Sequence, residues 1–216
     1  MLSLRNLIAV VAVACAALVG LHLAGHASAA NVAKFIASTA FIALAVRAGA
    51  TSSTYGRLIL LGLALSWCGD MFLTGQSQAA FLAGLSAFLL AHIAYVSAFI
   101  KHGVDRRWTI ATAVPITALA IAVWIWLQPH TAPALSIPVR AYIAVISLMV
   151  IFAFGARGKG GSVFIVAGAT LFFLSDLSVA ALRIIQTEYA TYALGLPAYY
   201  AGQVCFALSV RQSRSH

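Results

Sequence analysis

Continuous runs of about 18 to 22 apolar residues follow one another along nearly the whole chain. A helix rises about 1.5 Å per residue, so a run of this length crosses the hydrocarbon core of a bilayer. The runs do not alternate between polar and apolar residues, which favours helices over the strands of a β-barrel. With 63% hydrophobic and 8% charged residues, the chain has too few polar side chains to cover a soluble domain. The sequence therefore predicts an integral membrane protein built from helices.

Eight such runs are separated by short connections. We expect transmembrane helices at about 5–24, 31–48, 57–74, 79–100, 108–127, 138–155, 161–183 and 191–210. The connections contain Gly, Pro, Ser and His residues that favour turns, and because they are short, consecutive helices should be antiparallel neighbours. The predicted fold class is therefore all-α, a polytopic membrane helix bundle with eight transmembrane helices. It should form one transmembrane helical domain over residues 1–216.

Basic residues are distributed unevenly between the two ends of these helices. The end that includes both chain termini carries ten Lys and Arg residues, whereas the other end carries only Lys34, Arg140 and Arg183. Cytoplasmic loops are enriched in Lys and Arg, so both termini are expected in the cytoplasm. The same distribution explains the net charge of +9 without a nucleic-acid partner. Together with the Ala-rich composition, it predicts an integral protein of the bacterial inner (cytoplasmic) membrane.

The first apolar segment has a second interpretation. Arg5, the apolar stretch and the small residues Ala27, Ser28 and Ala29 have the order of a secretory signal peptide with its cleavage site. The apolar stretch is about 18 residues long, beyond the roughly 7 to 15 of a signal peptide, and this length favours a retained helix. Cleavage would leave seven spans.

Two aspartates, Asp70 and Asp176, lie deep within predicted spans and make up half of the four acidic residues. An ionisable side chain at the centre of a membrane helix costs about 2.5 kcal/mol or more, so it indicates a functional site. Each aspartate follows a Gly by eight positions and directly follows a small residue. At about 1.5 Å per residue, both lie about 20 Å from the cytoplasmic ends of their helices, and thus at similar depths.

The charged residues also recur at a fixed interval. Asp176 follows Asp70 by 106 positions, and Arg140 follows Lys34 by the same interval. A four-helix unit repeated once in the same orientation, a 4+4 internal repeat, gives this pattern; coincidence among few charges is the alternative. Lys34 and Arg140 begin near the outer surface, and they either reach toward the aspartates or extend to the membrane interface.

Several polar residues on neighbouring helices strengthen the interpretation of a site. One face of the predicted fourth helix carries Phe81, Gly84, Phe88, His92, Tyr95 and Phe99. An imidazole in a lipid-phase helix needs a hydrogen-bond partner, so His92 either belongs to the site or bonds a neighbouring helix for structural reasons. Later spans add Tyr142, Ser175, Tyr199, Tyr200 and Gln203. Near the bundle axis, these side chains would line a polar cavity with the two aspartates.

Five segments together resemble a known family. They are Ser66-Trp-Cys-Gly-Asp70-Met-Phe-Leu, Phe81-x-x-Gly84-x-x-x-Phe88-x-x-x-His92-x-x-Tyr95, Tyr142-x-x-x-Ile146-x-x-Met149, Gly168-x-x-x-Phe172-x-x-Ser175-Asp176 and Tyr199-Tyr200-x-x-Gln203. In this order, over about residues 31–205, they are similar to the membrane-bound lysoplasmalogenases, the YhhN-like proteins. The family usually has Lys-Pro in its second helix, whereas Phe35 follows Lys34 here.

The resemblance implies hydrolysis of the vinyl ether bond of lysoplasmalogens to a fatty aldehyde and glycerophosphoethanolamine or glycerophosphocholine. The substrate would be a single-chain ether lysophospholipid, taken from among membrane lipids. Such hydrolysis requires a general acid and a general base, and Asp70 and Asp176 are the catalytic candidates, with their individual roles open. This route needs no cofactor or metal; zinc bound by the two aspartates and His92 is the alternative.

The remaining candidates are assigned to substrate binding or support. Lys34, Arg140 and Tyr142 are expected to hold the phosphate head group. The residues expected to orient the acids or the water are His92, Tyr95, Ser175, Tyr199, Tyr200 and Gln203. A small proton-coupled transporter that uses the buried aspartates, and a lipid-binding or assembly protein, are the other classes left open. Apart from Pro115, no mid-helix Gly or Pro break is expected, which argues against a transporter.

Overall fold

The computed structural model describes residues 2–212, apart from the side chains of residues 189–192 and 212. Within this part of the chain the secondary structure is helical throughout, with no strands. The long helices are α1 (Leu4–Leu23), α2 (Ala27–Ala48), α3 (Thr54–Phe72), α4 (Gln78–His102), α5 (Arg106–Leu127), α6 (Ser136–Gly158), α7 (Val163–Ala180) and α8 (Tyr189–Gln212). Short elements are η1 (Ala50–Ser52), η2 (Gln128–His130), η3 (Pro133–Leu135) and a π-helical turn, η4 (Ala181–Ile185). The predicted all-α fold with eight long helices is confirmed.

Polar capping residues explain where the helices begin. Five helices start directly after a Ser or Asp whose side chain accepts a hydrogen bond from a backbone N–H of the first turn: Ser3, Ser53, Ser77, Asp105 and Ser162. Such a cap contributes about 1 kcal/mol to helix stability. Gly49 ends α2 in the left-handed conformation (φ 94°), which a glycine adopts without strain.

Seven helical segments of the described chain are long and apolar enough to cross a membrane. The eighth helix, α3, falls outside this group because it holds Arg57 and Asp70 within 19 residues. It nevertheless packs between α2, α4 and α8 in the interior of the bundle. Proline lies inside α8 at Pro197 as well as inside α5 at Pro115, so the expectation of a single mid-helix proline is wrong.

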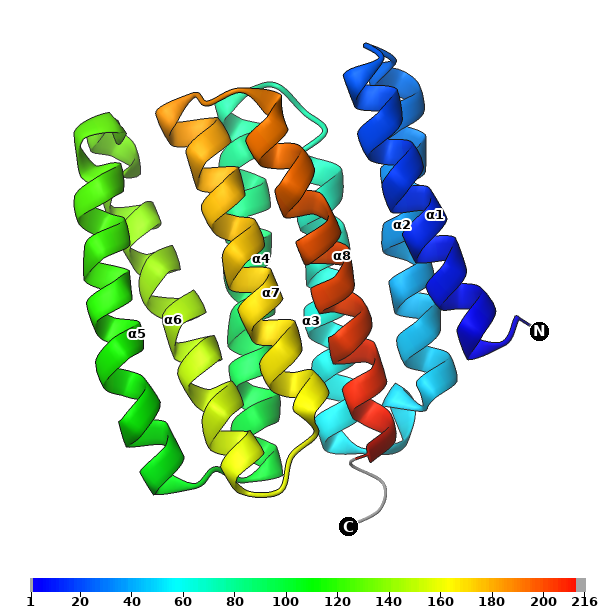
Figure 1. Ribbon diagram of the computed structural model, residues 1–216, viewed down its shortest axis with the longest axis vertical. Coiled ribbons are helices and arrows are strands. Elements are labelled where there is room, and N and C mark those ends of the chain that lie inside the picture. Colours follow the sequence, from blue (N-terminus) through cyan, green and yellow to red (C-terminus); the bar gives the residue numbers. More distant parts are fainter. Residues whose placement is uncertain (1, 213–216) are drawn as a thin grey trace.

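The helices form one bundle in which α1 and α5 occupy opposite flanks, and α7 and α8 lie in front of α3 and α4 in Figure 1. The main packing pairs are α1 with α2, α3 with α4, α5 with α6 and α7 with α8. Between these pairs, α2 contacts α3 and α8, while α6 contacts α7 and α4. Aromatic side chains fill the centre, where Phe41, Phe172 and Phe206 are fully buried.

Glycines allow the closest helix contacts. A Cβ on Gly62 of α3 would collide with the ring of Tyr95 on α4, and a Cβ on Gly168 of α7 would lie 2.7 Å from the ring of Phe206 on α8. Small residues at such crossings let two membrane helices approach and gain van der Waals contact, because lipid chains supply little hydrophobic drive between helices. These crossings set the positions of the polar side chains one or two turns away.

Candidate functional site

Asp70 lies on the inner face of α3 and receives hydroxyl donors from two other helices. Ser38 Oγ of α2 donates to Asp70 Oδ2 at 2.6 Å, and the Tyr199 hydroxyl of α8 donates to the same oxygen at 2.7 Å. Lys34 lies one helical turn before Ser38 and is 5% exposed, and its charge acts on Asp70. Asp70 itself is 4% exposed. A buried carboxylate is thus held by two hydroxyl groups beside a buried cation.

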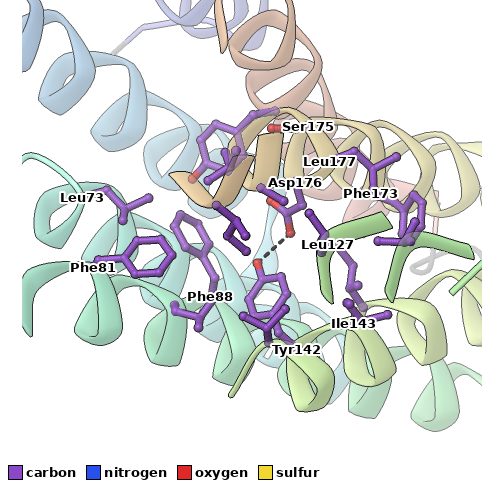
Figure 2. Close-up of a pocket in the computed structure, with 18 of the residues that line it drawn as sticks. Leu73, Phe81, Phe88, Leu127, Tyr142, Ile143, Phe173, Ser175, Asp176 and Leu177 are labelled. Carbon is purple, nitrogen blue, oxygen red and sulfur yellow. Dashed lines mark hydrogen bonds between the residues drawn. The ribbon is translucent and has the colours of Figure 1, made fainter. Parts of the chain in front are cut away.

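Asp176 on α7 has a comparable arrangement with different donors. The Tyr142 hydroxyl of α6 donates to Asp176 Oδ2 at 2.6 Å, as Figure 2 shows, and His92 Nε2 of α4 lies 3.3 Å from the same oxygen. His92 Nε2 also lies 2.9 Å from the Tyr142 hydroxyl, so the three side chains form a closed triangle. The other ring nitrogen of His92, Nδ1, is buried and has no hydrogen-bond partner among the described residues. The Asp176 side chain is 16% exposed, more than Asp70.

A second layer of buried polar groups supports these two clusters. The Tyr95 hydroxyl donates to Gln203 Oε1 at 2.9 Å and lies 3.4 Å from Ser66 Oγ. The Tyr200 hydroxyl lies 3.3 Å from Ser38 Oγ, which links it to the Asp70 cluster. Between the clusters, Phe172 contacts both the ring of His92 (centroids 4.7 Å apart) and the ring of Tyr199 (5.3 Å).

Both aspartates line the same cavity, which has a volume of about 90 Å³. That volume holds more than one water molecule. The other polar lining side chains are Tyr142, Ser175 and Tyr199, and most of the remaining lining is aliphatic or aromatic and comes from α3 to α7. The cavity therefore combines two carboxyl groups with an apolar wall, an arrangement suited to a substrate that has a hydrocarbon chain.

The structure gathers most of the side chains that the sequence singled out. Lys34, His92, Tyr142 and Tyr199 are around the two aspartates, Ser175 lines the cavity, and Tyr95, Tyr200 and Gln203 form the second layer. Arg140 is not brought to this group. It is exposed, its Nε donates to the Ser136 carbonyl at 3.2 Å, and its guanidinium lies 5.3 Å from the centroid of Trp124. The expectation that Arg140 extends toward the aspartates is therefore corrected.

One residue of the site, Ser38, was missed by the sequence reasoning. Serine is common in membrane helices, so its presence alone carried no signal. The spacing of Ser38 carried a usable signal, because residues four apart lie on the same helix face and Ser38 follows Lys34 by four positions. Among the described residues no group of three His, Cys, Asp or Glu side chains is placed to hold a metal ion.

The comparisons with known proteins agree with the motifs. The YhhN family model matches residues 29–210. Lysoplasmalogenase TMEM86A of Bos taurus is 32% identical over 167 residues, covering 72% of this chain and 66% of the relative, and TMEM86A of Homo sapiens is 32% identical over 162 residues with the same coverage. A lysoplasmalogenase of Mycobacterium bovis is 30% identical over 187 residues, covering 84% of this chain and 69% of the relative. The chain thus spans just under two thirds of the length of the TMEM86A proteins. No solved structure matches it significantly.

Proposed function

The chain belongs to the YhhN family, and we propose that it is a membrane hydrolase that cleaves the vinyl ether bond of lysoplasmalogens. Its curated relatives carry the name lysoplasmalogenase. The observation that carries the proposal is the pair of carboxyl groups, Asp70 and Asp176, on one apolar cavity between membrane helices. The products would be a fatty aldehyde and glycerophosphoethanolamine or glycerophosphocholine.

The chemistry of vinyl ethers explains why two carboxyl groups are useful. An acid protonates the β-carbon of the double bond, which leaves an oxocarbenium ion at the carbon attached to oxygen. Water then adds to this cation while a base takes the water's proton, and the resulting hemiacetal collapses to aldehyde and alcohol. One carboxyl group must therefore begin protonated and another ionised, a division that two different environments can maintain.

We assign the base to Asp70 and the acid to Asp176. Asp70 accepts two hydroxyl hydrogen bonds, and the charge of the buried Lys34 acts on it as well; both oppose the cost that burial imposes on its ionised form. Asp176 is grouped instead with the phenol of Tyr142 and the imidazole of His92. His92 can pass a proton to Asp176 after each turnover, because its Nε2 contacts the carboxylate directly.

Aldehyde release tests the activity. Detergent-purified protein is incubated with 1-alkenyl-glycerophosphoethanolamine, and the aldehyde is measured with a coupled dehydrogenase. Asp70→Asn and Asp176→Asn should each lose about 100-fold or more of the rate, the usual contribution of a general acid or base. Asp105→Asn is the matched control, because Asp105 caps α5 outside the cavity and Asn also caps helices well. The transporter would be established instead if the wild type releases no aldehyde and vesicles that contain it take up a solute when a pH gradient is applied.

Chemical rescue tests the two roles separately. Formate supplied in solution can replace a missing base, so it should raise the residual rate of Asp70→Asn. The same addition should leave Asp176→Asn unchanged, because protonation of carbon requires a positioned acid. Rescue of Asp176→Asn alone would reverse the assignment.

We further propose that the membrane is a bacterial inner membrane, with both chain termini in the cytoplasm. The uneven distribution of Lys and Arg supports this orientation. Recovery of the protein with the inner-membrane fraction of a two-membrane bacterial host tests the location.

A further inference from the structure

Arg183 lies at the edge of the cavity and is assigned to no role by the sequence. It belongs to the π-helical turn η4, which continues α7 beyond Ala180. The cavity is lined by Ala180 and Ile184, on either side of Arg183 in sequence, and by Leu73, the residue that ends α3. Arg183 Nη2 donates to the Leu73 carbonyl at 3.3 Å, so the guanidinium connects η4 to the C-terminal end of α3. Single π-turns inside helices occur frequently at functional sites.

The charge of Arg183 is not neutralised within the described part of the chain. Its guanidinium donates to a neutral carbonyl, and no described carboxylate lies within ion-pairing distance of it. A guanidinium has five N–H donors, and the hydrogen bond to Leu73 uses one of them. Arg183 is half-buried, so an anion that contacts its remaining donors would be partly shielded from water and bound more strongly than at an exposed arginine.

The cavity has two different ends. Figure 2 shows Leu73 and Phe81 at one end, Ile143 and Phe173 at the other, and the Asp176–Tyr142 pair between them. The guanidinium of Arg183 donates a hydrogen bond to the Leu73 carbonyl, at the first of these ends. The lining residues at both ends are apolar, and the Leu73 end differs in the guanidinium that is hydrogen-bonded to its backbone. A molecule with an anionic head at one end, a hydrocarbon chain at the other and the reactive bond between them matches this order.

We propose that Arg183 binds the phosphate group of the single-chain phospholipid substrate, an assignment that rests on the proposed function. Arg183 follows Asp176 by seven positions along α7 and η4, which separates the two by up to about 10 Å along the helix axis. The side chain of Arg183 spans part of this distance, and the glycerol backbone that separates the phosphate from the vinyl ether spans the rest. A guanidinium fork binds two phosphate oxygens at once, which an ammonium group cannot do.

Arg140 provides the comparison. It was the arginine expected to hold the head group, and it lies on the same side of the predicted membrane as Arg183. Its guanidinium, however, stacks on Trp124 and is exposed on the outside of the bundle. The two arginines therefore differ in position rather than in charge, and of the two only Arg183 hydrogen-bonds a residue of the cavity lining, Leu73.

Two substrates that differ only in the phosphate group test the proposal. One is 1-alkenyl-glycerophosphoethanolamine and the other is 1-alkenylglycerol, which has the same bond and chain without phosphate. Arg183→Gln should raise KM for the first about 10- to 100-fold with little change in kcat, the usual effect of removing a charged hydrogen bond. It should leave both constants for the second unchanged. Arg183→Lys should lie between wild type and Arg183→Gln, because the charge stays and the fork is lost.

The other outcomes overturn the assignment. An equal effect of Arg183→Gln on both substrates would indicate a structural role through the Leu73 hydrogen bond, and no effect on either would remove Arg183 from the site. A selective rise in KM in Arg140→Gln instead would return the head group to Arg140. If wild type releases no aldehyde from either substrate, the proposed function fails. Binding of the non-hydrolysable 1-alkyl lysophospholipid to wild type and Arg183→Gln then decides the phosphate site by itself.

Discussion

Each aspartate of the site is held at a single oxygen by donors from two other helices. Asp70 Oδ2 accepts hydrogen bonds from Ser38 and Tyr199, and Asp176 Oδ2 is contacted by Tyr142 and His92. The donors fix each carboxyl group relative to helices that are distant in sequence. At the residue scale, therefore, the geometry of the site depends on hydroxyl groups as much as on the two acids.

Removing one of these hydroxyl groups should shift the Asp70 carboxyl group from its position while leaving Asp70 in the chain. Under the proposed function, Ser38→Ala should lower kcat/KM for aldehyde release about tenfold, because one hydrogen bond to a carboxylate is lost. Ser97→Ala is the matched control, since the Ser97 hydroxyl bonds the Ile93 carbonyl of its own helix. Wild-type kinetics for Ser38→Ala would mean that Tyr199 alone positions the carboxylate.

At the scale of helices, the sequence predicted the elements well. The expected spans agree with the helices to within a few residues, because apolar runs have clear ends and are bounded by capping Ser and Asp or by Gly. The resemblance of the motifs to the YhhN-like proteins is also confirmed. The sequence pointed to both aspartates because a charged side chain in an apolar helix is energetically costly and therefore indicates a functional site. Which arginine contacts the cavity lining was not predictable, since the π-turn that carries Arg183 leaves no mark in the hydropathy pattern.

The 4+4 repeat stays a prediction, and the helix contacts support it. The pair α3–α4 and the pair α7–α8 both cross at a glycine under an aromatic ring, Gly62 under Tyr95 and Gly168 under Phe206. The two glycines are 106 positions apart, as are the two aspartates. The two aromatic residues are 111 positions apart, so the second unit has five more residues between its crossing positions. The turn η4, also five residues long, lies in that interval.

Equivalent crossings should respond alike to the same substitution. Gly62→Ala and Gly168→Ala each place a methyl group against a fully buried ring, and we expect each to destabilise the protein by about 1–3 kcal/mol. The Tyr95 ring is further held by its hydrogen bond to Gln203, so it cannot turn away without breaking that bond. Thermal unfolding in detergent measures both.

Gly20→Ala is the matched control for these substitutions. Gly20 also lies inside a helix, but a Cβ there would meet nothing within 4 Å. Its melting temperature should equal or exceed that of the wild type, because Ala is the better helix former. If Gly62→Ala melts like Gly20→Ala, the crossing of α3 and α4 is looser than the structure indicates.

At the scale of the whole molecule, α3 determines the topology. Among the long helices of the described residues, it alone contains no candidate membrane span by length and composition, and it carries one of the two aspartates. If α3 did not cross the membrane, every later helix would run in the opposite direction. Asp70 and Asp176 would then not share one cavity, and the basic residues would no longer gather on one side. The packing of α3 between α2, α4 and α8 therefore supports eight crossings.

Alkaline phosphatase fusions distinguish eight crossings from seven. The enzyme is active only outside the cytoplasm, so fusions in the α3–α4 connection at Gly75 and the α5–α6 connection at Pro129 should be active. Fusions at Gly103 and at Gly160 should be inactive, because Lys and Arg residues surround these two connections. Seven crossings would reverse the result at Gly75, Gly103, Pro129 and Gly160 together. A fusion in the α1–α2 connection at Gly25 is active under both topologies and controls for expression. Activity at Gly103 would thus contradict the eight-helix topology and, with it, the shared cavity on which the proposed chemistry depends.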